Sequence, residues 1–172
     1  MKILHISYDY FNTSVYKNLF RFLNVKNNIT CVVPLELDQK NKLNIVESDN
    51  IIPIFYGRPR PYSVQVNAKK YLKIIDDKID LSKYKLIHAH FTLNDGLIAL
   101  KLKKLKGIPY VISVRASCIM NLKRKLAFHN YITVLLVLIK SKAIFFQTKS
   151  VLNELLINTP LPFRKIIKKK YH

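Results

Sequence analysis

The sequence has little of what builds small disulfide-bonded or turn-rich proteins. Its 172 residues include three glycines, seven prolines, two cysteines and no tryptophan. So few glycines and prolines leave few special turns, which argues against a small all-β sandwich. Cys31 and Cys118 stand alone without a C-x-x-C pair. We interpret them as reduced thiols of a cytoplasmic protein, because neither a disulfide frame nor a zinc site has that pattern.

Long apolar runs and a leader-like start are also missing. The most apolar stretch, residues 131–139, is much shorter than the ~20 residues that a membrane-spanning helix requires. Residues 1–8 enter a buried-strand pattern instead of the basic and apolar regions of a signal peptide. We therefore expect a cytoplasmic protein whose contact with a membrane, if it has one, is peripheral and on the inner face.

Acidic residues are scarce, since ten Asp and Glu stand against 30 Lys and Arg, for a formal net charge of +20. A basic nucleic-acid-binding protein is one alternative, because clustered basic residues release counterions from a phosphate backbone. Most of these residues are lysines in a chain rich in Ile and Asn, as an AT-rich coding bias also produces, and no element interleaves aromatic and basic residues. We expect no nucleic-acid partner. The charge favours an anionic membrane surface, at roughly 1 kcal/mol per basic residue.

Apolar residues make up 49% of the chain, which is enough for one domain with a sizeable core. Short apolar runs alternate with helical stretches, the pattern of βαβ units. The expected strands are Ile3–Ser7, Ile29–Pro34, Ile51–Phe55, Lys85–His90, Tyr110–Val114 and Ala143–Gln147. The expected helices are Val15–Leu23, 64–79, Asn94–Lys106, Leu122–Lys140 and Lys149–Ile157, with Gly107 ending the third and the segment 163–171 basic and amphipathic. The sequence predicts a Rossmann-like, doubly wound α/β fold with a mainly parallel sheet in the order 3-2-1-4-5-6.

No common phosphate-binding loop is present. Neither G-x-G-x-x-G nor G-x-x-x-x-G-K-[ST] occurs anywhere in the chain, and residues 57–61 (GRPRP) are predicted to be an ordinary loop. A lobe of this fold without such a loop is not expected to hold a nucleotide by itself.

In an open parallel sheet, ligands bind outside the carboxyl ends of the strands. That rule selects Asn12 after the first strand, His90, Asp95 and Gly96 after the fourth, and Arg115 and Ser117 after the fifth. Arg115 suits recognition of a carboxylate or phosphate, although a surface ion pair is the alternative. Asp95 either contacts substrate or only stabilises the first turn of its helix. The sequence leaves these pairs of alternatives open.

His88 and His90 lie two residues apart, so their imidazoles project from the same face of one strand. A metal site needs a third ligand at a suitable spacing, and only Asp95 is near in sequence. We therefore predict no metal site. His88 is interpreted as a structural histidine beneath a helix and His90, nearer the strand end, as a substrate contact. His5, in the middle of the first strand, is interpreted as structural.

Residues 86–117, LIHAHFTLNDGLIALKLKKLKGIPYVISVRAS, resemble the middle of the N-terminal domain of family 4 glycosyltransferases. Members of that family show a strand ending in H-x-H-[FW], an acidic residue and a glycine at a helix start, then G-I-P-[YV]-V and a V-[RH]-G-[ST]-D turn. The opening MKILHIS and residues 143–150, AIFFQTKS, are also similar to that family. The resemblance thus extends over nearly the whole chain.

The resemblance implies that residues 1–172 form the acceptor-binding lobe of a retaining, metal-independent GT-B enzyme. The nucleotide sugar would be a co-substrate, held mainly by a second, donor-binding domain that the sequence does not contain, and no other cofactor is expected. The implied partners are a glycan or lipid-linked acceptor and a donor-binding domain or subunit, and the implied product is a cell-surface polysaccharide. His90, Asp95, Gly96 and Arg115 fall on positions that line the interdomain cleft, and Ser7–Asn12 match the loop after the first strand.

Three departures from the family pattern keep a second hypothesis open. Tyr8–Thr13 replace the glycine-rich stretch after the first strand, and Ala116 and Cys118 replace the glycine and the acid of the R-G-[ST]-D turn. The chain also ends about where such enzymes enter the second lobe. A noncatalytic relic or binding module of the same fold would account for these departures, and the chain alone is expected to be inactive.

Overall fold

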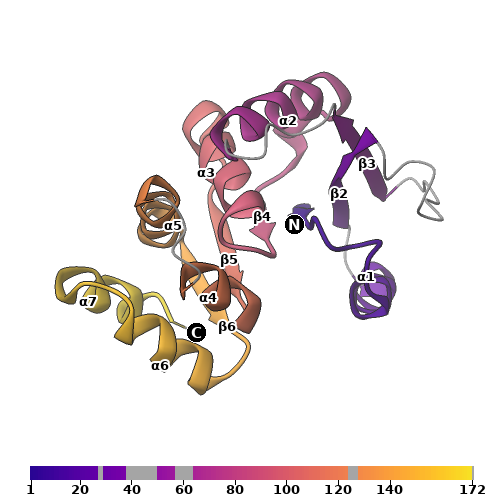
Figure 1. Ribbon diagram of the computed structural model, residues 1–172. Coiled ribbons are helices and arrows are strands. Elements are labelled where there is room, and N and C mark those ends of the chain that lie inside the picture. The colour runs from indigo at the N-terminus through magenta and orange to yellow at the C-terminus, as the bar shows by residue number, and fades with distance from the viewer. Residues whose placement is uncertain (27–28, 38–49, 57–63, 124–127, 172) are drawn as a thin grey trace.

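The computed structural model describes residues 1–26, 29–37, 50–56, 64–123 and 128–171 (Figure 1). The strands are β1 (Ile3–Ile6), β2 (Ile29–Glu36), β3 (Ile51–Tyr56), β4 (Leu86–Ala89), β5 (Tyr110–Val114) and β6 (Ala143–Phe146). The helices are α1 (Ser14–Lys26), α2 (Val64–Lys78), the short 3₁₀ helix η2 (Leu81–Lys83), α3 (Asn94–Lys106), α4 (Ala116–Lys123), α5 (Phe128–Lys140), α6 (Lys149–Ile157) and α7 (Leu161–Lys169). The loop predicted at 57–61 lies outside the described residues.

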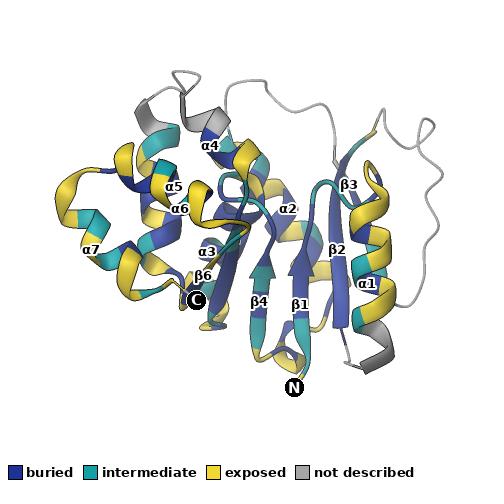
Figure 2. Ribbon diagram, turned by 90° about the horizontal axis from the view of Figure 1, so that it is seen from below, coloured by how far each residue is buried: buried dark blue, intermediate teal, exposed yellow. Residues whose placement is uncertain are grey.

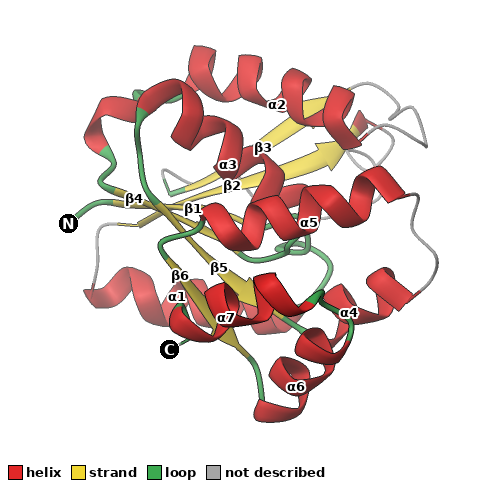
Figure 3. Ribbon diagram, turned by 90° about the vertical axis from the view of Figure 1, so that its left-hand side faces the viewer, coloured by secondary structure: helices red, strands yellow, loops and turns green. Residues whose placement is uncertain are grey.

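The strands form one six-stranded sheet in the order β3-β2-β1-β4-β5-β6, and every pair is parallel. This confirms the predicted doubly wound fold and its strand order. Helices cover both faces of the sheet, so the central strands are mostly apolar, with His5 and His88 on the face that carries α1. Helices α2, α3 and α5 lie on one side of the sheet and α1 on the other (Figure 3).

Apolar side chains form two clusters, one on each face of the sheet. The larger combines Leu4, Ile87 and Ile112 with the inner faces of α2, α3 and α5. The smaller combines Cys31 and Val33 with residues of α1 and of the loop after β1. Figure 2 shows α1 beside the buried strands that it covers. The sheet is therefore packed on both faces, and its carboxyl edge carries the loops after β1, β4 and β5.

The prediction of one helix over Leu122–Lys140 was wrong. A separate helix, α4, begins at Ala116, directly after β5, and α5 begins at Phe128. Residues 116–140 contain neither glycine nor proline, so periodicity alone gave no boundary between the two helices. The resemblance had also favoured a turn where α4 begins. The last segment, predicted to be no more than amphipathic, forms α7, whose first turn contains Pro162.

Two glycines determine the end and the packing of α3. Gly107 ends the helix in the left-handed conformation, with φ of 72°, and its N–H donates to the Lys103 carbonyl, as its position after the helix predicted. Gly96, in the first turn, lies against the neighbouring elements. A Cβ atom at Gly96 would come within 2.6 Å of Val137 Cγ1 on α5 and 2.9 Å of Ile112 Cδ1 on β5. The first turn of α3 therefore packs closely against α5 and β5.

Candidate functional site

The loops after β1 and β4 are joined at the carboxyl edge of the sheet by one buried carboxyl group. Asp95, in the first turn of α3, is fully buried, and its Oδ2 accepts the Tyr8 N–H at 3.4 Å. Burial raises the pKa of Asp95 well above its usual value, although the backbone N–H groups of Tyr8, Phe91 and His90 act in the opposite direction. Asp95 thus fixes the loop that begins at Tyr8, and its carboxyl group favours the protonated form.

Arg115, the residue after β5, lies between α1 and the loop after β4. It is partly buried, and its guanidinium carbon lies 4.6 Å from the ring centroid of Tyr16 on α1 and 5.8 Å from that of Phe91. Among the residues that the structure describes, no carboxylate lies within ion-pair distance of Arg115. The charge is therefore held by aromatic rings rather than neutralised, which leaves it able to attract an anion.

A cavity of about 280 Å³ opens beside Arg115. It is lined by Val15 from α1, by Ser113, Val114 and Arg115 from the end of β5, and by Phe145, Phe146 and Gln147 from the end of β6. Apolar walls with a few convergent polar groups are typical of small-molecule sites. This strand-end pocket is small enough for a single sugar unit or the end of a larger acceptor.

A larger cavity, of about 540 Å³, lies at the opposite edge of the sheet. Its lining includes Lys85, at the start of β4, and the loop 107–109 before β5, and Asp76 and Lys106 form an ion pair there with a 2.6 Å separation. We assign the candidate site to the carboxyl edge in spite of the difference in volume. Asp95 occurs at that edge, as does Arg115, whose charge no described carboxylate neutralises, and ligands of open parallel sheets bind there.

The structure brings some of the predicted site residues together and separates others. His90 is buried next to the strand-end loops, and its Nε2 lies 3.1 Å from Nδ1 of His5. Gly96 is buried against α5 and β5, where its lack of a side chain allows close packing. Asn12 is exposed and donates to Asp9 Oδ1 at 3.1 Å. Ser117 is exposed in the first turn of α4. Binding of substrate by these residues stays a prediction.

Sequence reasoning did not select Tyr16, Ser113 or Gln147. Gln147 follows β6, so the strand-end rule would have found it had the sixth strand been included. Ser113 lies inside β5 and Tyr16 inside α1, and no local pattern marks either residue. The Tyr16 ring meets Arg115 only because the crossover from β1 to β2 places α1 beneath the strand ends. Cys118, where the family has an acid, is buried in the larger core cluster.

No protein-family model matches the sequence, and no curated protein matches it. Among solved structures, the chain is similar to UDP-GlcNAc 2-epimerase from Neisseria meningitidis bound to UDP-GlcNAc, with a TM-score of 0.56, 18% identity, and coverage of 99% of this chain and 45% of that one. It is also similar to a putative UDP-N-acetylglucosamine 2-epimerase from Listeria monocytogenes, with a TM-score of 0.56, 12% identity, and coverage of 94% and 42%. A third similar structure is Arabidopsis thaliana UGT89C1 complexed with UDP-L-rhamnose, with a TM-score of 0.54, 10% identity, and coverage of 86% and 44%.

These similarities concern the fold. The chain spans less than half the length of each of these neighbours, and the identities are low. Among the described residues, no helix has both the length and the apolar character needed to span a membrane. The six-stranded parallel sheet with helices on both faces is the Rossmann-like α/β fold of one lobe of a GT-B architecture.

Proposed function

We propose that the chain is the acceptor-binding domain of a retaining glycosyltransferase. The transfer would move a sugar from a nucleotide sugar to a cell-surface polysaccharide precursor or a lipid-linked acceptor. The observation that carries this proposal is the strand-end pocket, which combines an arginine that no described carboxylate neutralises with apolar walls on a GT-B-like lobe. An anionic group of the acceptor would bind Arg115, and a sugar ring would lie against Phe145, whose side chain is exposed.

The sequence supports binding of the acceptor and of the nucleotide by two different domains. The sequence has no glycine-rich phosphate loop, so the nucleotide would be bound mainly by a second domain or subunit. Neither a resident cofactor nor a catalytic metal is part of this proposal. His90, Asp95, Gly96, Ser117 and Asn12 remain the proposed acceptor-side residues together with Arg115. Asp95 would act by holding the loop that begins at Tyr8 rather than by touching the reacting atoms.

Attachment to the inner face of the membrane is a second part of the proposal. On α7, Lys165 and Lys168 line one surface cavity together with Leu161, which is 72% exposed, and Lys169 is also exposed. An exposed apolar residue beside several lysines is suited to the surface of an anionic bilayer. A lipid-linked acceptor would be met at the same surface.

The alternative with the same fold is a noncatalytic binding module. Cys118 stands where the R-G-[ST]-D turn has its acid, and it is buried in the core. This position therefore supplies no carboxylate to the pocket, which favours the binding module. Both functions predict acceptor binding, but only the first predicts sugar transfer once a donor-binding domain is supplied.

The experiment is a transfer assay with radiolabelled UDP-sugars and a membrane extract as the acceptor source. The purified chain alone is expected to transfer nothing, and the chain fused to a donor-binding GT-B lobe is expected to label the extract. Turnover by the chain alone would overturn the division of labour. Failure of the fusion, with both lobes folded, would favour the binding module.

A further inference from the structure

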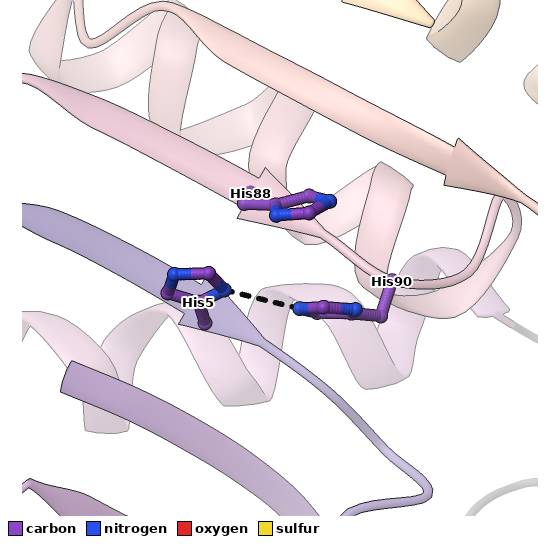
Figure 4. Close-up of side chains that lie close together, drawn as sticks. All are labelled: His5, His88 and His90. Atoms are coloured by element: carbon purple, nitrogen blue, oxygen red, sulfur yellow. Dashed lines mark hydrogen bonds between the residues drawn. The ribbon is translucent and has the colours of Figure 1, made fainter. Parts of the chain in front are cut away.

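Three histidines meet on the face of the sheet that carries α1 (Figure 4). His5 and His88 are partners in the parallel register of β1 and β4, and His90 follows two residues after His88. The Nδ1 atom of His5 lies 3.1 Å from Nε2 of His90, and one nitrogen from each ring lies within 4.8 Å of the others. His5 is distant from His88 and His90 in the sequence, and only the pairing of β1 with β4 brings it beside them.

We propose that His5, His88 and His90 form a binding site for a divalent transition metal of the zinc type. Zinc binds imidazole nitrogen at about 2.0–2.1 Å, so neighbouring ligand atoms of a tetrahedral site lie about 3.4 Å apart. The His5–His90 separation is close to that value, and the other ligand atoms, within 4.8 Å of one another, would move closer on metal binding. Three protein ligands would leave the fourth position for water or a substrate atom.

The pKa values of all three histidines are lowered. Burial, followed by the charge of His88, lowers the pKa of His5 to about 3. Burial, followed by the charge of Arg115, lowers the pKa of His88 to about 4. The pKa of His90 is also well below its usual value, mainly because of burial. Burial thus disfavours the charged form of each of the three rings.

A further observation concerns the ligand set, in which His90 takes part through Nε2, the nitrogen that faces His5. His88 Nε2 lies 2.8 Å from Ser113 Oγ, which leaves Nδ1 of His88 available and orients its ring as an outer-shell partner would. Ser113 also lines the strand-end pocket, so the cluster adjoins the proposed acceptor site.

The surroundings would close the site on the side of α1. The Phe20 ring stands edge-on to His5 at 4.9 Å and the Tyr16 ring edge-on to His90 at 5.3 Å, measured between centroids. His5 and His90 are buried, whereas His88 is partly exposed. A metal would therefore enter past His88, from the side where Ser113 lines the pocket.

The test uses the untagged, EDTA-treated and desalted full chain, titrated with Zn²⁺ against a chromophoric chelator. One Zn²⁺ per chain is expected, and Co²⁺ in its place should give the strong visible absorption of tetrahedral coordination. His88→Ala should weaken Zn²⁺ binding roughly a hundredfold or more, because loss of an outer-shell partner alone costs about 10–100-fold. Ser113→Ala, which removes no ligand and little volume, should weaken it about tenfold or more.

The control is the double variant His129→Ala/His172→Ala, which removes the two other histidines and should bind Zn²⁺ as the wild-type chain does. Circular dichroism establishes that each variant is folded. Absence of stoichiometric Zn²⁺ binding by the wild-type chain would overturn the proposal. It would also be overturned if Ser113→Ala bound Zn²⁺ as wild type does while the control variant lost Zn²⁺ binding. The readout is metal bound to the isolated chain, so its outcome is independent of the proposed sugar transfer.

Discussion

At the scale of single residues, Arg115 carries most of the argument for acceptor binding. Its guanidinium lies over the Tyr16 ring, and no described carboxylate pairs with it. A charge-assisted pair with an anionic acceptor group is worth ~1.5–3 kcal/mol. In the proposed fusion with a donor-binding lobe, Arg115→Ala should raise the acceptor's apparent Kd about tenfold or more. The lost contact with Tyr16 should cost only ~0.5–1 kcal/mol of stability.

The matched control is Arg21→Ala, because Arg21 is an exposed arginine of α1 that does not line the strand-end pocket. Acceptor affinity should be unchanged in that variant. If Arg115→Ala instead lowers the Tm and leaves acceptor affinity as it was, Arg115 serves only to cover Tyr16.

Asp95 gives a second prediction at this scale, through the pH dependence of stability. Because burial raises its native pKa, the carboxyl group contributes stability below its unfolded pKa near 3.8, and this contribution is lost as the pH rises through the native pKa. Asp95→Asn lacks that titration. Its free energy of unfolding relative to wild type should therefore increase between pH 4 and pH 7, measured by urea denaturation.

Asp80→Asn provides the opposite case as a control. Hydrogen bonds from Ser82 are the largest cause of the lowered pKa of Asp80. The free energy of unfolding of wild type relative to Asp80→Asn should therefore increase as the pH rises from acid. If the free energy of unfolding of wild type also increases relative to Asp95→Asn as the pH rises, the carboxyl group of Asp95 is ionised in the native state and is stabilised by the backbone N–H groups.

At the scale of elements, the close approach of α3 to α5 and β5 depends on Gly96. A Cβ there would come within 2.6 Å of Val137 Cγ1, so Gly96→Ala should destabilise the chain by ~1–3 kcal/mol. Val137→Ala should relieve part of the overlap, so the double variant should be more stable than the two single effects predict, as a double-mutant cycle in urea would show. Strictly additive effects would mean that α3 moves away from α5 instead.

Helix α7 gives the prediction about membranes. Co-sedimentation with vesicles containing anionic phospholipid should be weak and should decrease as salt rises, since charges are screened within ~10 Å at 0.1 M. Lys165→Glu/Lys168→Glu should abolish it, whereas Lys70→Glu/Lys73→Glu, an equal charge change on exposed positions of α2, should reduce it only slightly. An equal loss of vesicle binding in both variants, or vesicle binding that does not change with salt concentration, would count against α7 as the membrane contact.

At the scale of the whole molecule, the sequence predicted what depends on local pattern. Apolar runs bounded by polar residues predicted all six strands, and Gly107 predicted the end of α3. Contacts between distant segments had no such signal. The meeting of His5 with His88 follows from strand register, and the meeting of Arg115 with Tyr16 follows from the crossover through α1. The boundary between α4 and α5 was missed because no breaker residue marks it.

The central claim is that this lobe binds the acceptor and leaves the nucleotide to another domain. The most direct test is an NMR titration of the ¹⁵N-labelled chain with UDP and UDP-GlcNAc, and separately with polyprenyl phosphate in micelles and uronic-acid oligosaccharides. We expect no saturable shifts with either nucleotide, and saturable shifts at Arg115 and Gln147 with at least one acceptor-type probe. Saturable binding of UDP in the strand-end pocket, without binding of any acceptor-type probe, would contradict the account.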